Sequence, residues 1–127
     1  MSSLKILIVD DDEDYRKIAV KRLESWGYDV ISAASGKEGV EAVKEKSPDL
    51  VVLDYLMPGM DGIETLKEIR SIDSGVPVIM STSFPDGRSI VGTEKLGISA
   101  YIPKSGVFTD PIVSLKAAID MACKKAK

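Results

Sequence analysis

Short apolar runs alternate along this chain with longer segments in which apolar residues recur every three or four positions. The short runs predict strands, and the longer spacing predicts amphipathic helices. Strands are expected near 4–10, 28–33, 50–54, 76–81 and 99–102. Helices are expected near 13–26, 36–46, 62–71, 86–96 and 111–125. This alternation predicts an α/β fold, a doubly wound parallel sheet with helices on both faces.

Residues that begin or end helices stand at several of these boundaries. Gly27 is placed to end the first helix, and Ser35 with Glu38 forms a capping box for the second. The second strand alternates only partly, which places it nearer a sheet edge. The first helix presents one apolar face, made of Tyr15, Ile18, Ala19, Leu23 and Trp26.

The 127 residues are enough for one domain with a real core, so we expect residues 1–127 to form a single domain without an output domain. No run approaches the roughly 20 apolar residues that span a bilayer, so no membrane insertion is expected. The N-terminus, Met1-Ser2-Ser3, leads straight into the strand expected at 4–10 with no signal peptide, which makes the cytoplasm the expected location. A net charge of -3 argues against direct nucleic-acid binding.

Histidine is absent from the chain. This excludes Ser-His-Asp and Cys-His nucleophiles and the usual histidine-bearing zinc sites. It also means that the chain has no phosphohistidine of its own.

Four of the predicted strands end on residues that can interact with a phosphoryl group. These are Asp10 with Asp11, then Asp54, then Ser81 with Thr82, and finally Lys104. The carboxyl ends of neighbouring parallel strands meet at one rim, where ligands of open α/β sheets bind. Carboxylates, a hydroxyl and an ammonium together suit a divalent metal beside a phosphoryl group, with one carboxylate left as the acceptor.

The first of these strand ends opens an acidic loop, 10–14, where a dinucleotide-binding fold would have a glycine-rich turn. Like charges about 4 Å apart repel by roughly 4 kcal/mol at an effective dielectric near 20, which a divalent cation reverses. Oxygen ligands with waters retained suit Mg²⁺. For Asp10 and Asp11 the metal site is favoured. For Asp12, Glu13 and Asp14 we favour the simpler interpretation that they complement the positive end of the following helix.

Asp54 precedes a loop constrained by proline and glycines, and a carboxylate at a strand end beside Mg²⁺ is a plausible phosphoryl acceptor. Taken alone, Asp54 would favour the interpretation as a turn aspartate. Thr82 and Lys104 could bind phosphoryl oxygens. Alone, the threonine would be a turn residue and the lysine a solvated one. It is their combination at strand ends that favours phosphoryl chemistry.

Four fragments in order resemble the receiver domain of two-component response regulators. They are Ile8-Val9-Asp10-Asp11, the segment 54–62 that begins Asp54-Tyr-Leu-Met-Pro, Val78-Ile-Met-Ser-Thr82, and Tyr101-Ile-Pro-Lys104. Each fragment is weakly specific, but the ordered set is strongly specific and spans nearly the whole chain. The resemblance implies a flavodoxin-like five-stranded sheet of order 2-1-3-4-5 with five helices.

The resemblance also implies site roles. Asp54 would accept the phosphoryl group from the phosphohistidine of a sensor histidine kinase. Asp11, Asp54 and the backbone carbonyl of Leu56 would ligate Mg²⁺ directly, and Asp10 would hold the ion through water. Thr82 and Lys104 would bind the phosphoryl group.

A conformational switch belongs to the same expectation: Thr82 moves toward the phosphate and Tyr101 turns inward. The reshaped surface would be recognised by a downstream target protein or by a histidine phosphotransfer protein. The chain would act as a signalling protein and not as an enzyme, as a monomer or a phosphorylation-dependent dimer. It could stand alone, as chemotaxis regulators do, or be part of a longer regulator.

One departure and several alternatives remain. Ser105 follows Lys104 where the family usually has proline, so we expect a different loop after the lysine. A haloacid dehalogenase-type phosphatase also uses a strand-end aspartate, but its motif asks for a small residue where Asp14 stands. A receiver-like binding module that does not use phosphate is another alternative. A flavodoxin-like electron carrier is disfavoured, because the acidic loop would repel a flavin phosphate.

The resemblance places Leu56 and Phe84 beside the route of the water that hydrolyses the phosphorylated aspartate. Both are apolar, so we expect slow hydrolysis and a long-lived phosphorylated state. Replacing both with polar residues should shorten that lifetime, measured by timing phosphate release. An unchanged lifetime would contradict the prediction.

Overall fold

The computed structural model describes residues 4–54, 62–82, 100–103 and 116–121. Its elements follow the predicted alternation in order: β1 (Lys5–Val9), α1 (Glu13–Ser25), β2 (Asp29–Ala33), α2 (Gly36–Lys46), β3 (Leu50–Asp54), α3 (Gly62–Ile72), β4 (Val78–Thr82) and β5 (Ala100–Pro103). Residues 116–121 are also helical, inside the helix expected at 111–125. The rest of that helix and the helix expected at 86–96 lie outside the described residues.

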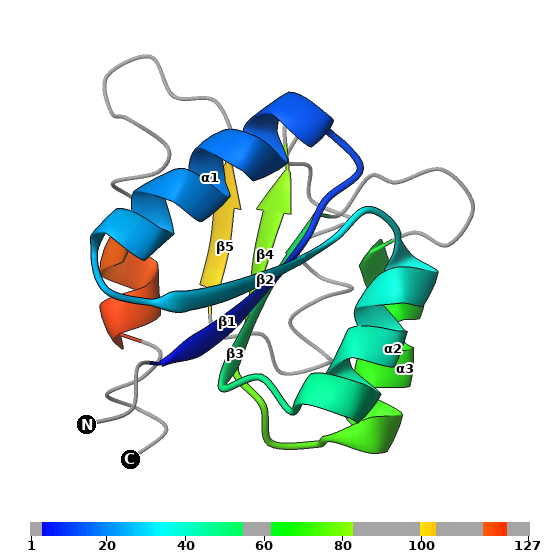
Figure 1. Cartoon of the computed structure of the whole chain (residues 1–127). Helices are drawn as coiled ribbons and strands as arrows, with labels where there is room; N and C mark the ends of the chain where they lie inside the picture. The colour runs from blue at the N-terminus through cyan, green and yellow to red at the C-terminus, as the bar shows by residue number, and fades with distance from the viewer. Residues whose placement is uncertain (1–3, 55–61, 83–99, 104–115, 122–127) are drawn as a thin grey trace.

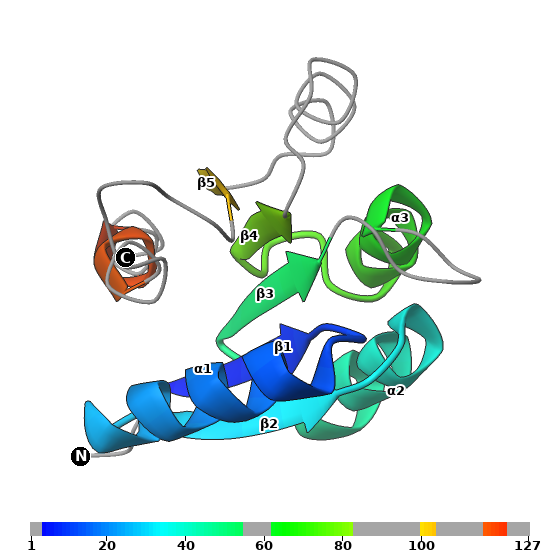
Figure 2. The same cartoon turned by 90° about the horizontal axis from the view of Figure 1, so that it is seen from above.

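The five strands form one sheet in the order β2-β1-β3-β4-β5, which confirms the predicted order (Figure 1). Every neighbouring pair of strands is parallel. The partly alternating strand β2 lies at an edge, as its sequence indicated. Viewed from above, α1 and helix 116–121 cover one face of the sheet, and α2 and α3 cover the other (Figure 2).

Two apolar cores flank the sheet because successive side chains of a strand point to opposite faces. On the α2 and α3 side the core includes Leu7, Val9, Val51, Leu53, Val78 and Met80. On the α1 side it includes Ile6, Ile8, Leu50, Val52, Ile79 and Ile119. Full burial of such a side chain contributes about 1.5–3 kcal/mol, so the central strands hold the rim residues on a rigid support.

Both ends of α1 are set by local hydrogen bonds. The Asp12 side chain caps the start, accepting a bond of 3.1 Å from the backbone N–H of Tyr15. At the other end Gly27 adopts φ +93°, and its N–H and that of Tyr28 donate to the carbonyls of Glu24 and Leu23. This arrangement is a Schellman motif, which confirms the predicted stop at Gly27.

One residue of the predicted apolar face of α1 was placed wrongly. Ala19 and Leu23 are fully buried, and Tyr15 and Trp26 pack against the same core. Ile18 is instead 54% exposed. It precedes Ala19 by one position, which turns its side chain about 100° away around the helix, beyond the buried stripe.

The predicted capping box at the start of α2 is confirmed. The hydroxyl of Ser35 accepts a hydrogen bond of 3.2 Å from the N–H of Glu38. The Glu38 carboxylate accepts in return from the N–H of Ala34 at 3.1 Å, one residue before the N-cap Ser35, so the return bond of the motif is shifted by one position.

A polar and aromatic cluster joins helix 116–121 to α1 and β2. The Trp26 ring makes cation–π contacts with the Arg22 guanidinium, 5.5 Å from the ring centroid, and with the Lys116 ammonium, 5.8 Å from it. The Tyr28 hydroxyl donates to the Asp120 carboxylate at 2.9 Å, and Lys116 pairs with the same carboxylate at 3.0 Å. With Ile119 buried beneath them, these contacts fix this helix against the α1 face.

Helix α2 packs closely on β1 at Gly39. A Cβ at this position would lie 2.7 and 2.9 Å from the two γ-carbons of Val9. Val9 is fully buried and β-branched, so its side chain has little freedom to move.

We therefore expect Gly39→Ala to lower the free energy of unfolding by about 1 kcal/mol in urea titrations, because the overpacking cost exceeds the gain in helix propensity. Gly75→Ala is the control, since the nearest atom to its added Cβ is 3.8 Å away. Val9→Ala should lower the free energy of unfolding less in the Gly39→Ala background than in wild type, because in that background it also removes the close contact with the added Cβ. Wild-type stability in Gly39→Ala would contradict this account of the packing.

Candidate phosphoryl-acceptor site

Three carboxylates meet at the carboxyl-terminal rim of the sheet. Asp10 and Asp11 directly follow β1, and Asp54 is the last residue of β3, the neighbouring parallel strand. One carboxylate oxygen from each lies within 4.8 Å of the others. Asp10 and Asp54 are only 2% and 3% exposed, whereas Asp11 faces solvent. The structure thus brings together carboxylates that the sequence separates by more than forty residues.

This cluster is electrostatically suited to a cation. Carboxylates at such distances repel one another, and the partial burial of the group strengthens the repulsion. A divalent ion held by carboxylate oxygens reverses the sign of the interaction, and the oxygen-only donor set suits Mg²⁺ or another hard cation. The residues present therefore fit a magnesium site.

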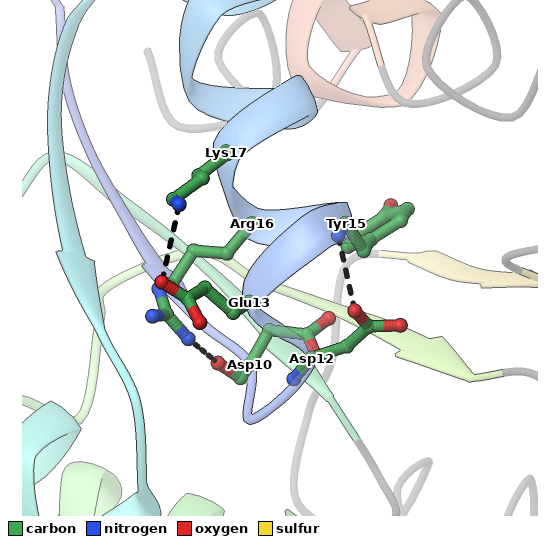
Figure 3. A network of polar contacts seen from close by, with 6 residues as sticks. All are labelled: Asp10, Asp12, Glu13, Tyr15, Arg16 and Lys17. Carbon is green, nitrogen blue, oxygen red and sulfur yellow. Dashed lines mark hydrogen bonds and ion pairs between the residues drawn. The ribbon is translucent and has the colours of Figure 1, made fainter.

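The acidic loop divides into two parts, as predicted. Asp12 caps α1, and Glu13 with Asp14 occupies the first turn of that helix, where negative charge is favourable. Lys17 forms an exposed ion pair with Glu13 at 3.1 Å, which adds little stability (Figure 3). These three acidic residues serve the helix, and Asp10 and Asp11 belong to the cluster.

Two hydrogen bonds fix the Asp10 segment. Its carboxylate accepts from the N–H of Asp12 at 2.9 Å, and its backbone carbonyl accepts from the Arg16 guanidinium at 2.7 Å (Figure 3). Arg16 was not among the predicted site residues, because its position in α1 gives no hint that it turns back to the preceding loop. It holds the turn that orients Asp10.

The remaining predicted residues are placed only as far as the backbone describes them. Asp54 pairs with Ser81 in the register between β3 and β4. Thr82 ends β4 opposite Pro103, and Tyr101 lies opposite Met80. Thr82 is thus at the same rim as Asp54. Lys104 and Leu56 lie outside the described residues, so their roles and the switch at Thr82 and Tyr101 stay predictions.

Comparison with known proteins identifies this architecture. Residues 6–112 match the family described as the response regulator receiver domain. The chain belongs to that family. The receiver domain is a signalling module, and the resemblance deduced from the four strand-end fragments is confirmed.

Individual relatives agree with this assignment. The chain is 43% identical over 104 residues to a probable transcriptional regulator ycf27 of Porphyridium aerugineum, covering 82% of this chain and 43% of that protein. It is 37% identical over 117 residues to the transcriptional regulatory protein ZraR of Escherichia coli K12, covering 92% of this chain and 26% of that protein. The receiver thus spans less than half the length of these curated relatives.

A solved structure of similar size supports the fold. A CheY-like response regulator receiver domain protein from Methanospirillum hungatei JF-1 matches with a TM-score of 0.87 and 29% identity, covering 97% of this chain and 96% of that one. The chain is therefore a CheY-like receiver with a flavodoxin-like sheet. Among the helices in the described ranges, none has both the length and the apolar character needed to cross a membrane.

The repulsion within the cluster leads to a prediction without metal. Asp11→Asn should raise the melting temperature in EDTA by about 2–4 °C for a domain of this size, because it removes one of three adjacent negative charges. Asp14→Asn is the matched control and should leave the temperature unchanged or lower it, since Asp14 interacts favourably with the start of α1. A lower melting temperature for Asp11→Asn than for wild type would show that the cluster is not repulsive.

Proposed function

We propose that this chain is a phosphorylation-activated signalling receiver in which Asp54 accepts a phosphoryl group from the phosphohistidine of a sensor histidine kinase. The observation that carries this proposal is the convergence of Asp10, Asp11 and Asp54 within 4.8 Å. A nearly buried carboxylate at a strand end, with two more carboxylates to hold a cation, is what phosphoryl acceptance requires. These 127 residues include no histidine, so the phosphohistidine would lie outside this receiver.

Mg²⁺ is the proposed cofactor. Asp11, Asp54 and the backbone carbonyl of Leu56 would bind it directly, and Asp10 would do so through water. When bound, the ion supplies the positive charge that allows an anionic phosphoryl group to approach an anionic carboxylate. Asp10 and Asp12 are already joined by a hydrogen bond, so the loop is largely in place before the ion arrives.

The transfer step follows from the chemistry of the acceptor. A carboxylate oxygen of Asp54 attacks phosphorus, the new O–P bond forms, and the P–N bond to imidazole breaks. The imidazole nitrogen keeps the electron pair and takes up a proton. The Lys104 ammonium and the Thr82 hydroxyl would bind the phosphoryl oxygens and offset their charge.

The output of the site is a changed protein-binding surface. Thr82 would move toward the phosphoryl group and Tyr101 would turn inward, so that a downstream target or a histidine phosphotransfer protein recognises the new surface. The domain would be a monomer or dimerise on phosphorylation, in the cytoplasm. Its product is the aspartyl phosphate itself, so we assign it a signalling role and not enzymatic turnover.

The domain assignment is part of the same proposal: residues 1–127 form one receiver. The relatives named above are transcriptional regulators by name. By analogy, this receiver would control an output carried by a partner or by a longer regulator, without contacting nucleic acid directly. The net charge of -3 agrees with that indirect role.

Incubation with acetyl phosphate and Mg²⁺ should add one phosphoryl group, detected by intact-protein mass spectrometry. Asp54→Asn should abolish the gain, and EDTA should prevent it. Asp49→Asn is the matched control, because Asp49 precedes β3, at the end of that strand opposite to Asp54, and accepts from the N–H of Lys5 there at 2.8 Å. The control should be phosphorylated like wild type.

Two outcomes would overturn the proposal. Equal phosphorylation of Asp54→Asn and wild type would place the acceptor elsewhere. No mass gain in wild type under these conditions would favour a receiver-like binding module that does not use phosphate.

A further inference from the structure

Within the part of the chain that the structure describes, the hydroxyl of Ser81 is a buried polar atom without a hydrogen-bond partner. Ser81 is only 1% exposed and lies on β4, a central strand of the sheet. Buried polar groups in proteins are nearly always paired, and each exception calls for an explanation. An unpaired buried hydroxyl lowers the stability of the state that contains it.

The strand register places Ser81 beside the proposed phosphoryl acceptor. Ser81 pairs with Asp54 across parallel strands, so both side chains project from the same face of the sheet. The residues two positions earlier, Ile79 and Val52, lie together in the α1-side core. Ser81 and Asp54 therefore mark the point where this apolar face changes to a polar rim.

Asp10, which follows β1, adds a third polar residue to Asp54 and Ser81 along the same face of neighbouring strands, and these three form one row. It follows Ile8 by two positions, and Ile8 belongs to the same α1-side core. Asp10, Asp54 and Ser81 are exposed by only 2%, 3% and 1%. The two carboxylates have hydrogen-bonding or electrostatic partners, whereas the Ser81 hydroxyl has none among the described residues. The Ser81 hydroxyl is thus available to donate a hydrogen bond next to the Asp54 carboxylate.

We propose that Ser81 is a positioning residue of this site, whose hydroxyl donates a hydrogen bond to an oxygen of the phosphorylated Asp54 side chain. This inference rests on the proposed function. Phosphorylation adds strong acceptor oxygens beside a donor that is unpaired among the described residues of the resting protein. The bond forms as the phosphoryl group is transferred and persists in the phosphorylated state, so it favours both the transfer and its product and adds nothing to the resting state.

The test compares Ser81→Thr with Ser81→Val. The two replacements have the same shape, so any packing strain is common to both, and only threonine keeps the hydroxyl. With acetyl phosphate and Mg²⁺, the valine variant should be phosphorylated about tenfold more slowly than the threonine variant, as expected for loss of one charge-assisted hydrogen bond. Beryllofluoride, a phosphoryl mimic, should raise the melting temperature of the threonine variant more than that of the valine variant.

The resting state gives an independent readout with the opposite sign. Ser81→Ala should raise the melting temperature in EDTA by about 2–4 °C, because it removes an unpaired buried hydroxyl without adding volume. The same variant should be phosphorylated more slowly than wild type. If Ser81 had only a structural role, its replacement by alanine would not both raise the melting temperature and slow phosphorylation. Ser81→Ala also keeps the test decisive if the larger side chains prevent folding.

Ser71→Ala serves as the control hydroxyl deletion, since Ser71 lies in the last turn of α3 and donates to the carbonyl of Glu68. It should leave phosphorylation unchanged. Equal phosphorylation rates and equal beryllofluoride shifts in the threonine and valine variants would overturn the inference while leaving the proposed function intact. Failure of the proposed function is recognised separately, because wild type would then show neither a mass gain nor a beryllofluoride shift.

Discussion

The site depends on one constraint: parallel strands end at the same rim, so residues that follow them must share a small space. Here that space holds three mutually repelling carboxylates. Packing of the central strands offsets this repulsion, because their side chains are almost fully buried on both faces of the sheet. Apolar burial therefore supplies the free energy that keeps charges together, and the cation or phosphoryl chemistry uses an arrangement that exists beforehand.

Helix α1 connects this rim to the rest of the domain. Its N-cap, Asp12, is hydrogen-bonded to the side chain of Asp10, and Arg16 from its second turn holds the backbone carbonyl of Asp10. At its other end the C-cap residue, Trp26, makes cation–π contacts with both Arg22 and Lys116. The same helix thus orients a site residue at one end and anchors helix 116–121 at the other.

The boundary between core and rim is a change of side-chain chemistry along single strands. In β3 the α1-side face carries Leu50 and Val52 before Asp54, and in β4 it carries Ile79 before Ser81. Because alternate side chains of a strand share a face, Asp54 and Ser81 lie next to the apolar Val52 and Ile79 and are almost fully buried. Charge and hydrogen-bond changes at such positions are felt strongly, because little solvent is present to screen them.

The sequence alone determined the element order, the parallel topology and the identity of the acidic residues, because strand and helix periodicity, caps and strand-end chemistry are local signals. The Gly27 stop and the Ser35–Glu38 capping box are of this kind. Only the tertiary structure decided which groups meet. The exposure of Ile18, the reach of Arg16 to Asp10 and the unpaired hydroxyl of Ser81 depend on how separate segments pack. Such contacts leave no periodic trace along the chain, since they arise from the relative placement of elements and not from the preferences of any one of them.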